Sequence, residues 1–422
     1  MAPGWLPVNE NQAARLTRMG RAGDSWSNAS HLICQGYRLP ADFDTTRLAW
    51  AVEELAGRHD ALSTVFDPAA LRQRVGRTRP TLTSIRHAEE RCDPPAATQA
   101  LDLTTGPTAR FILSDHDGHH DLWITVEHLV SDGWAMRLIE RELDQLVRSG
   151  RPFEQAPTAQ NADHAAWEAA YCDSDAGRRA LAHWDSILSG GSPWPELVYP
   201  GSRRPGAFDR DATTPVTVKL GVDEVAALNG RCREAGVSGF VAVLDALGAA
   251  ARARTGLSRV GLLSPVANRW STKLKGAVTF ASSLVPLFVP CPGDPATRLT
   301  DLRNQVLDAV RYGQYPIHRY TRERHPGEWG RPQSKPLLYA DLVDTVLPTA
   351  LGRRIPDLDE PVVLGLGLWA DLDEAEPTLT FRHPRGFLPD GELEALAAAT
   401  KHNLTGRPLA APAAQSGSAD HV

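Results

Sequence analysis

The sequence predicts an α/β fold built in two halves, and three observations carry the prediction. Apolar side chains occupy every second position of residues 122–126, which is the period of a half-buried strand. Apolar residues then recur at helical spacing over residues 138–147. Residues 188–214 are rich in Gly, Pro, Ser and Arg, as in a linker, and the alternation of strands and helices starts again after them.

In the first half, the clearest elements surround one histidine. Asp44 is a candidate N-cap for a helix with apolar residues at helical spacing that ends near residue 58. The strand over residues 122–126 ends just before His128, and a helix begins after Gly133. An imidazole at such a strand end can face a cleft and take or hold a proton near neutral pH.

The second half repeats this style. We expect a strand over residues 214–220, helices over residues 223–235 and 237–255, and strands near residues 260–263 and 285–289. The end of the chain is rich in Ala, Pro, Ser and Gly, which is typical of a disordered tail. The predicted divisions are a first lobe at residues 1–182, a crossing segment at 183–213, a second lobe at 214–405 and a tail at 406–422.

Composition excludes several classes of partner. The chain has 422 residues, of which 42% are hydrophobic, enough for a large core. Its net charge of -6 implies no basic surface for nucleic acid or acidic lipid. Five scattered cysteines without a Cys-x-x-Cys pair indicate reduced thiols rather than a disulfide framework or a metal site. With no apolar run of membrane-helix length and no signal peptide, we expect a cytoplasmic protein with no membrane partner.

Several motifs, in order, resemble one known family. Residues 127–134 read Glu-His-Leu-Val-Ser-Asp-Gly-Trp and are similar to the His-His-x-x-x-Asp-Gly motif of nonribosomal peptide synthetase condensation domains. Residues 58–66 resemble the family's Arg-His-Glu-x-Leu-Arg-Thr-x-Phe block, and residues 264–269 resemble its Pro-Val-Ala-x-Arg block. The likeness extends over residues 5–405 and further includes residues 101–107, 161–167, 280–286 and 315–316.

The resemblance implies a fold and a place for the active site. These domains belong to the chloramphenicol acetyltransferase-like acyltransferases, whose two α/β lobes form a V-shaped pseudo-dimer. The active site then lies in the tunnel between the lobes. The first lobe supplies the His-x-x-x-Asp loop, and the second supplies the Pro-Val-Ala-x-Arg block. Because no carrier-protein or adenylation segment follows, we expect a free-standing condensation domain.

The resemblance also assigns roles. His128 matches the histidine tied to catalysis and would remove a proton from the attacking nucleophile or hold that nucleophile in line; the alternative is a structural histidine. Asp132 would pair with Arg269 to fix the loop, although an Asp-Gly turn alone also explains it. Backbone N–H groups near Gly133, at a helix start, would stabilise the developing oxyanion.

Three residues of the motif region leave alternatives open. Glu127 stands where most condensation domains have histidine, so this position is either structural or a sign of a divergent acceptor or altered chemistry. Neighbouring residues on a strand point to opposite faces, so Glu127 is not expected to pass a proton to His128. Ser282 replaces a common asparagine and either lines the tunnel or is an ordinary strand serine. Trp134 either walls the cleft or belongs to the core.

Three functions remain possible. The first is a condensation enzyme that joins an acyl group, carried on the phosphopantetheine arm of an acyl or peptidyl carrier protein, to a small-molecule amine or alcohol. The second is an acyltransferase of the same fold that uses a coenzyme A thioester. The third is a catalytically silent module that binds carrier proteins, against which the retained His128 argues. Since no phosphate-binding loop, nucleophile elbow or dinucleotide motif appears, we expect no bound cofactor and no metal.

Overall fold

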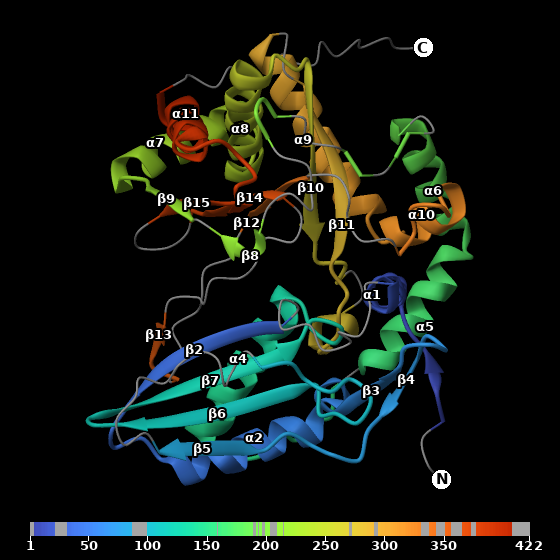
Figure 1. The fold of residues 1–422 in the computed structure, drawn as a ribbon, viewed down its shortest axis with the longest axis vertical. Helices are drawn as coiled ribbons and strands as arrows, with labels where there is room; N and C mark the ends of the chain where they lie inside the picture. The colour runs from blue at the N-terminus through green and yellow to red at the C-terminus, as the bar shows by residue number, and fades with distance from the viewer. Residues whose placement is uncertain are drawn as a thin grey trace, which may run out of the picture.

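The computed structural model has two lobes, each built on a sheet flanked by helices (Figure 1). Helices α5 and α6 run along one side from the lower lobe to the upper lobe. The predicted two-part α/β architecture is therefore present. The structure describes residues 4–21, 32–86, 99–157, 159–188, 191–192, 194–195, 199–202, 209–213, 215–269, 272–290, 294–330, 337–342, 351–355, 365–372 and 377–406.

The first lobe has a five-stranded sheet in the order β13-β2-β7-β6-β5, with two helices packed on one face. Apolar side chains from that face and from the helices share one core. A smaller sheet, β1-β4-β3, lies beside it. The elements are β1 (Leu6–Pro7), β2 (Leu32–Pro40), α2 (Thr45–Arg58), η2 (Asp60–Ser63), β3 (Thr64–Asp67), β4 (Arg72–Val75), β5 (Leu82–Arg86), β6 (Ala109–His116), β7 (His119–Glu127) and α4 (Gly133–Ser149).

Aspartate caps begin both helices of this lobe. The Asp44 side chain accepts a hydrogen bond from the backbone N–H of Arg47, 2.9 Å away, at the start of α2. Asp132 does the same for Ala135 at the start of α4, also at 2.9 Å. At the other end of α4, Gly150 adopts the left-handed conformation, with φ 60°, that glycine accommodates without a steric penalty. The predicted cap at Asp44 and the predicted helix after Gly133 are confirmed.

One strand of this sheet comes from the other half of the sequence. β13 (Arg353–Ile355) pairs antiparallel with β2, with Arg353 opposite Arg38 and Ile355 opposite Gly36. It is three residues long and separated from β2 by more than 300 positions, so no local pattern indicates it. The two halves of the chain are thus joined through a shared sheet.

The second lobe has a six-stranded sheet in the order β11-β10-β12-β14-β15-β9. Its core takes side chains from that sheet, from the helices around it and from α6. The expected strands and helices of this half are confirmed, with bounds shifted by a few residues. The elements are β9 (Val216–Lys219), α7 (Val222–Ala235), α8 (Gly239–Thr255), β10 (Arg259–Val266), η3 (Leu274–Gly276), β11 (Ser283–Pro290), α9 (Pro295–Tyr312), β12 (Leu337–Leu342), β14 (Gly365–Asp371), β15 (Thr378–Arg382) and α11 (Glu392–Gly406), with β8 (Asp209–Thr213) and β16 (Pro384–Arg385) as a separate pair.

Four further helices lie where the lobes meet or along their common side: α1 (Glu10–Arg21), α5 (Asn161–Cys172), α6 (Asp175–Leu188) and α10 (Ile317–Arg324). The predicted lobe boundary at residue 182 falls within α6, whose Trp184 is buried in the core of the second lobe. The divisions at residues 182, 213 and 405 stay predictions, since parts of the crossing segment are not described. The predicted tail beyond residue 406 lies outside the described residues.

Within the described part of the chain, no single helix is long and apolar enough to cross a membrane. Helices α7 and α8 pass that test only as a pair bent by 99°, on length and composition alone.

Candidate active site

His128 lies directly after β7, in the loop that leads to α4, as the sequence predicted. Its Nδ1 is 2.7 Å from the carbonyl oxygen of Ser131. A carbonyl only accepts hydrogen bonds, so Nδ1 carries the proton and Nε2 keeps its lone pair. The imidazole is half-buried and rests against Phe280 of the second lobe, with ring centroids 4.5 Å apart. The loop therefore presents an oriented imidazole at the junction of the lobes.

The surroundings keep this imidazole uncharged. Burial, and then the positive charge of Arg15, lower the pKa of His128 to about 4. Below its pKa the ring would lose the Nε2 lone pair to a proton, but at neutral pH it is neutral. His128 is consequently a hydrogen-bond acceptor at Nε2 throughout the physiological range.

Asp132 connects the motif loop to the second lobe through four hydrogen bonds. Its Oδ1 accepts from Nη2 of Arg269 at 2.8 Å and from the Ala135 N–H at 2.9 Å. Its Oδ2 accepts from the backbone N–H groups of Ala281 at 3.0 Å and Ser282 at 2.8 Å. Both side chains of the ion pair are only 2% exposed. The predicted pairing of Asp132 with Arg269 is present, and it also holds the segment just before β11.

The electrostatics of Asp132 suit a permanently charged anchor. Burial alone would raise its pKa, but the Arg269 guanidinium and the three backbone N–H donors outweigh burial, so the pKa lies below its usual value. A carboxylate held ionised in this way, and engaged in four hydrogen bonds, is not placed to exchange protons near neutral pH. This geometry agrees with the supporting rather than proton-transferring role that the resemblance implies.

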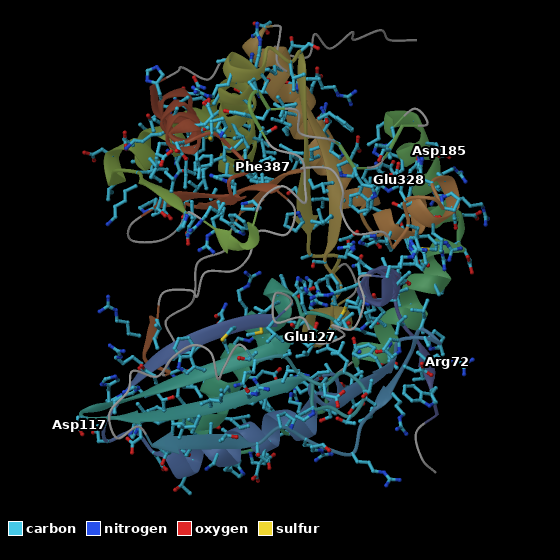
Figure 2. The ribbon with its side chains drawn as sticks, viewed as in Figure 1. Arg72, Asp117, Glu127, Asp185, Glu328 and Phe387 are labelled. Atoms are coloured by element: carbon cyan, nitrogen blue, oxygen red, sulfur yellow. The ribbon has the colours of Figure 1, made fainter. Side chains whose placement is uncertain are left out.

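Glu127, the departure from the family motif, has a partner that the sequence did not indicate. Its Oε1 lies 3.5 Å from Nη2 of Arg15, which is buried in α1. Burial raises the pKa of Glu127 to about 7, although Arg15 and the backbone N–H groups of Leu129 and His128 act in the opposite direction. Figure 2 shows Glu127 at the end of β7 where the lobes meet. Arg15 acts electrostatically on both Glu127 and His128, so the acid and the imidazole share one buried cation.

Helix α1 ties this site together, and sequence reasoning missed it. Gln12 donates through Nε2 to the carbonyl oxygen of Leu129 at 2.7 Å, inside the motif loop. Asn11 donates to the carbonyl oxygen of Ser282 at 2.7 Å, in the second lobe. The available signal was the spacing of Asn11 and Arg15, which lie on one face four residues apart. Without a known partner for that face, a solvated surface was the simpler interpretation.

The remaining predicted residues lie close to this loop. Gly133 is exposed, and a side chain there would meet open space, so the start of α4 is accessible. Trp134 is half-buried and donates through Nε1 to the carbonyl oxygen of Lys275 at 3.0 Å, where it lines a cavity rather than the core. Ser282 is half-buried and is held through its backbone by Asp132 and Asn11.

One group of side chains could hold a metal ion, and it lies away from this site. The ligand atoms of His116, His119 and Asp121, on the β6–β7 hairpin, are within 4.8 Å of one another. Both oxygens of Asp121 already accept hydrogen bonds from Arg38, at 2.9 and 3.1 Å. A cation would have to compete with this guanidinium. Asp117, in the same hairpin turn, marks the tip of the sheet far from Glu127 (Figure 2).

Comparison with known proteins identifies the family. The family model described as Condensation domain matches residues 22–328 of the chain. The chain belongs to the condensation-domain family. The resemblance read from the motifs is thereby confirmed. Among curated relatives, malpinin synthetase of Mortierella alpina is 26% identical over 329 residues, which cover 74% of this chain and 4% of that protein. This chain spans only 3% to 12% of the length of the curated relatives it matches.

Solved structures of condensation domains share the fold. The condensation domain from the monacolin K polyketide synthase superposes with a TM-score of 0.80 at 17% identity, covering 97% of this chain and 99% of that one. The X-domain from teicoplanin biosynthesis gives a TM-score of 0.78 at 20% identity, with 97% of each chain covered. The expected two-lobed condensation-domain fold is therefore confirmed, while the chemistry must be argued from this chain's own residues.

Proposed function

We propose that this condensation domain joins an acyl group, presented as a thioester on the phosphopantetheine arm of a carrier protein, to an amine or alcohol. The observation that carries the proposal is the state of His128. Its Nδ1–H donates to the carbonyl oxygen of Ser131, which leaves the Nε2 lone pair without a hydrogen-bond partner among the described residues. A thioester already supplies the activation for acyl transfer, so the domain has to position the nucleophile and manage one proton.

His128 would do both at Nε2. A neutral imidazole whose pKa is about 4 is a weak base toward a resting amine or hydroxyl, but it accepts a hydrogen bond from either. The nucleophile attacks the thioester carbonyl carbon, and its proton becomes acidic as the new bond forms. The proton then passes to Nε2, and the imidazolium returns it to the thiolate as the carbon–sulfur bond breaks. Positioning of this kind and proton transfer, the latter worth about 10²–10⁴-fold, act together.

The negative charge that develops on the carbonyl oxygen needs hydrogen-bond donors. The exposed start of α4 at Gly133 offers backbone N–H groups and the positive end of a 17-residue helix. Asp132 does not compete for them, because its Oδ1 caps Ala135 further along the first turn. We therefore propose Gly133 as the oxyanion-stabilising position, with Asp132 and Arg269 as supports that hold the loop against the second lobe.

The test uses intact-protein mass spectrometry. A carrier protein loaded with an acyl group is incubated with a panel of amines and alcohols, with and without the domain. The proposal predicts loss of the acyl mass from the carrier only when domain and acceptor are both present, together with the amide or ester product. In a parallel arm, acyl-coenzyme A replaces the carrier. Consumption of acyl-coenzyme A with an untouched carrier would instead establish the coenzyme A-dependent acyltransferase.

A further inference from the structure

The second lobe contains a cavity of about 610 Å³ at the end of its core that faces the motif loop. Cavities of about 300–1,000 Å³ are the size that holds small-molecule ligands. It lies between strands β10 and β11 and the C-terminal half of α9, which packs along these strands (Figure 1). Its walls are mostly apolar and include Phe240, Val266, Val285, Leu287, Val306 and Val310.

The cavity is continuous with the site already described. Trp134, the residue after Gly133 in the motif, lines it, and so does Arg269, the partner of Asp132. Strand β11 leads into it from the segment that contacts His128 through Phe280 and Asp132 through Ser282. A ligand whose reacting carbonyl lies beside His128 can therefore extend along β11 into this space.

The charges around the cavity limit what it accepts. The polar residues that line it include two cations, Lys275 and Arg269, and none of the lining residues is acidic. An ammonium group placed here would meet like charge and lose its hydration without a counter-ion. A neutral apolar group loses only its contact with water, which is favourable. The occupant is thus uncharged and apolar, which disfavours an aminoacyl group with a free amine.

We infer that this cavity binds the apolar tail of the acyl donor, so that the donor is a medium-length alkanoyl or similarly apolar acyl group. The inference rests on the proposed function, because it places the tail of the same thioester whose carbonyl lies beside His128. Each buried methylene contributes about 0.8 kcal/mol, which corresponds to about a fourfold gain in affinity. Affinity should consequently rise steeply with chain length and stop rising when the cavity is full.

The experiment measures binding without chemistry. S-alkyl pantetheine thioethers with 2 to 12 carbons have no carbonyl to react, and their affinity is measured by isothermal titration calorimetry. We expect affinity to increase about fourfold per methylene over several carbons and then to level off. A terminal ammonium on an eight-carbon chain should weaken binding at least tenfold relative to the plain eight-carbon probe. A binding series of this kind is readable even if the domain transfers no acyl group.

Two substitutions on α9 locate the chain. Val310→Phe fills part of the cavity, so affinity should level off at a shorter chain and fall at least tenfold for the longest probe. Leu307→Phe is the matched control, because Leu307 is on the same helix but 58% exposed and outside the cavity. Affinity that does not depend on chain length in the wild-type protein would overturn the inference, whatever the variants do. The inference is also wrong if the two variants behave alike, or if 1-alkanols rather than thioethers show the dependence on chain length and on Val310, since the cavity would then hold the acceptor.

Discussion

Replacing Asp132 with alanine should be far more damaging than removing an ordinary helix cap. The substitution leaves Arg269 as a buried cation that has lost its carboxylate, which costs about 3–5 kcal/mol. It also removes the N-cap of α4, which costs about 1 kcal/mol more. The expected loss of unfolding free energy is therefore about 4–6 kcal/mol, a large part of the about 5–15 kcal/mol that stabilises a typical protein.

The chain offers a matched control in Asp44, which caps α2 by the same contact but has no cationic partner among the described residues. Asp44→Ala should cost only about 1 kcal/mol. Urea unfolding followed by circular dichroism gives both values, provided that the denaturant slope is the same for each variant. The difference between the variants, about 3–5 kcal/mol, isolates the ion pair. Equal losses in Asp132→Ala and Asp44→Ala would refute the reasoning.

Three further predictions concern the buried charges around His128. Glu127→Gln should gain stability over the wild type as pH rises from about 4.5 to 7: the folded wild type keeps a proton that the unfolded chain has released, so ionising Glu127 costs about 3 kcal/mol over this window; parallel melts that show no pH-dependent difference would count against it. Single-turnover transfer rates should stay level on lowering the pH from 8 to about 5.5, since Nε2 of His128 protonates only near pH 4; a fall centred at about 6.5 would show an unshifted imidazole. Arg15→Met should move that acid limb to higher pH, because a charge that disfavours the imidazolium is gone, and an unmoved limb would remove Arg15 from the account.

Elements with strong local signals were predictable from the sequence. The cap at Asp44, the alternation over residues 122–126 and the helical spacing over residues 138–147 each depend on side chains a few positions apart, and the structure has a cap, a strand and a helix there. The Asp132–Arg269 pair joins residues 137 positions apart, so periodicity could not indicate it. It was accessible only because two motifs resembled blocks of a known family.

Other features arise from packing between distant segments and left no readable signal. Strand β13 pairs with β2 across the chain, and three residues are too few to show a period. Arg15 becomes a site residue only because α1 packs where the lobes meet and buries its guanidinium beside Glu127. The cavity under α9 is a gap between side chains that are individually ordinary apolar residues. Such features follow from how elements meet rather than from any one element.

The presence of Arg15 also bears on the alternatives for Glu127. An acid beside a buried guanidinium has a structural reason to replace histidine, because it reduces the cost of burying that cation. Transfer activity that survives in Glu127→Gln and Glu127→His would agree with this structural interpretation. Loss of activity in folded proteins would mean that the acid takes part in the reaction.

The most direct test of the account is the single-turnover unloading of an acylated carrier protein by the wild-type domain, His128→Ala and His119→Ala, followed by intact-protein mass spectrometry. His119 is the control because it lies on the β6–β7 hairpin, away from the motif loop. The account predicts that His128→Ala slows acyl transfer by at least about 10²-fold with an unchanged melting curve, while His119→Ala transfers at the wild-type rate. Wild-type transfer by a folded His128→Ala protein would contradict the central role of this histidine.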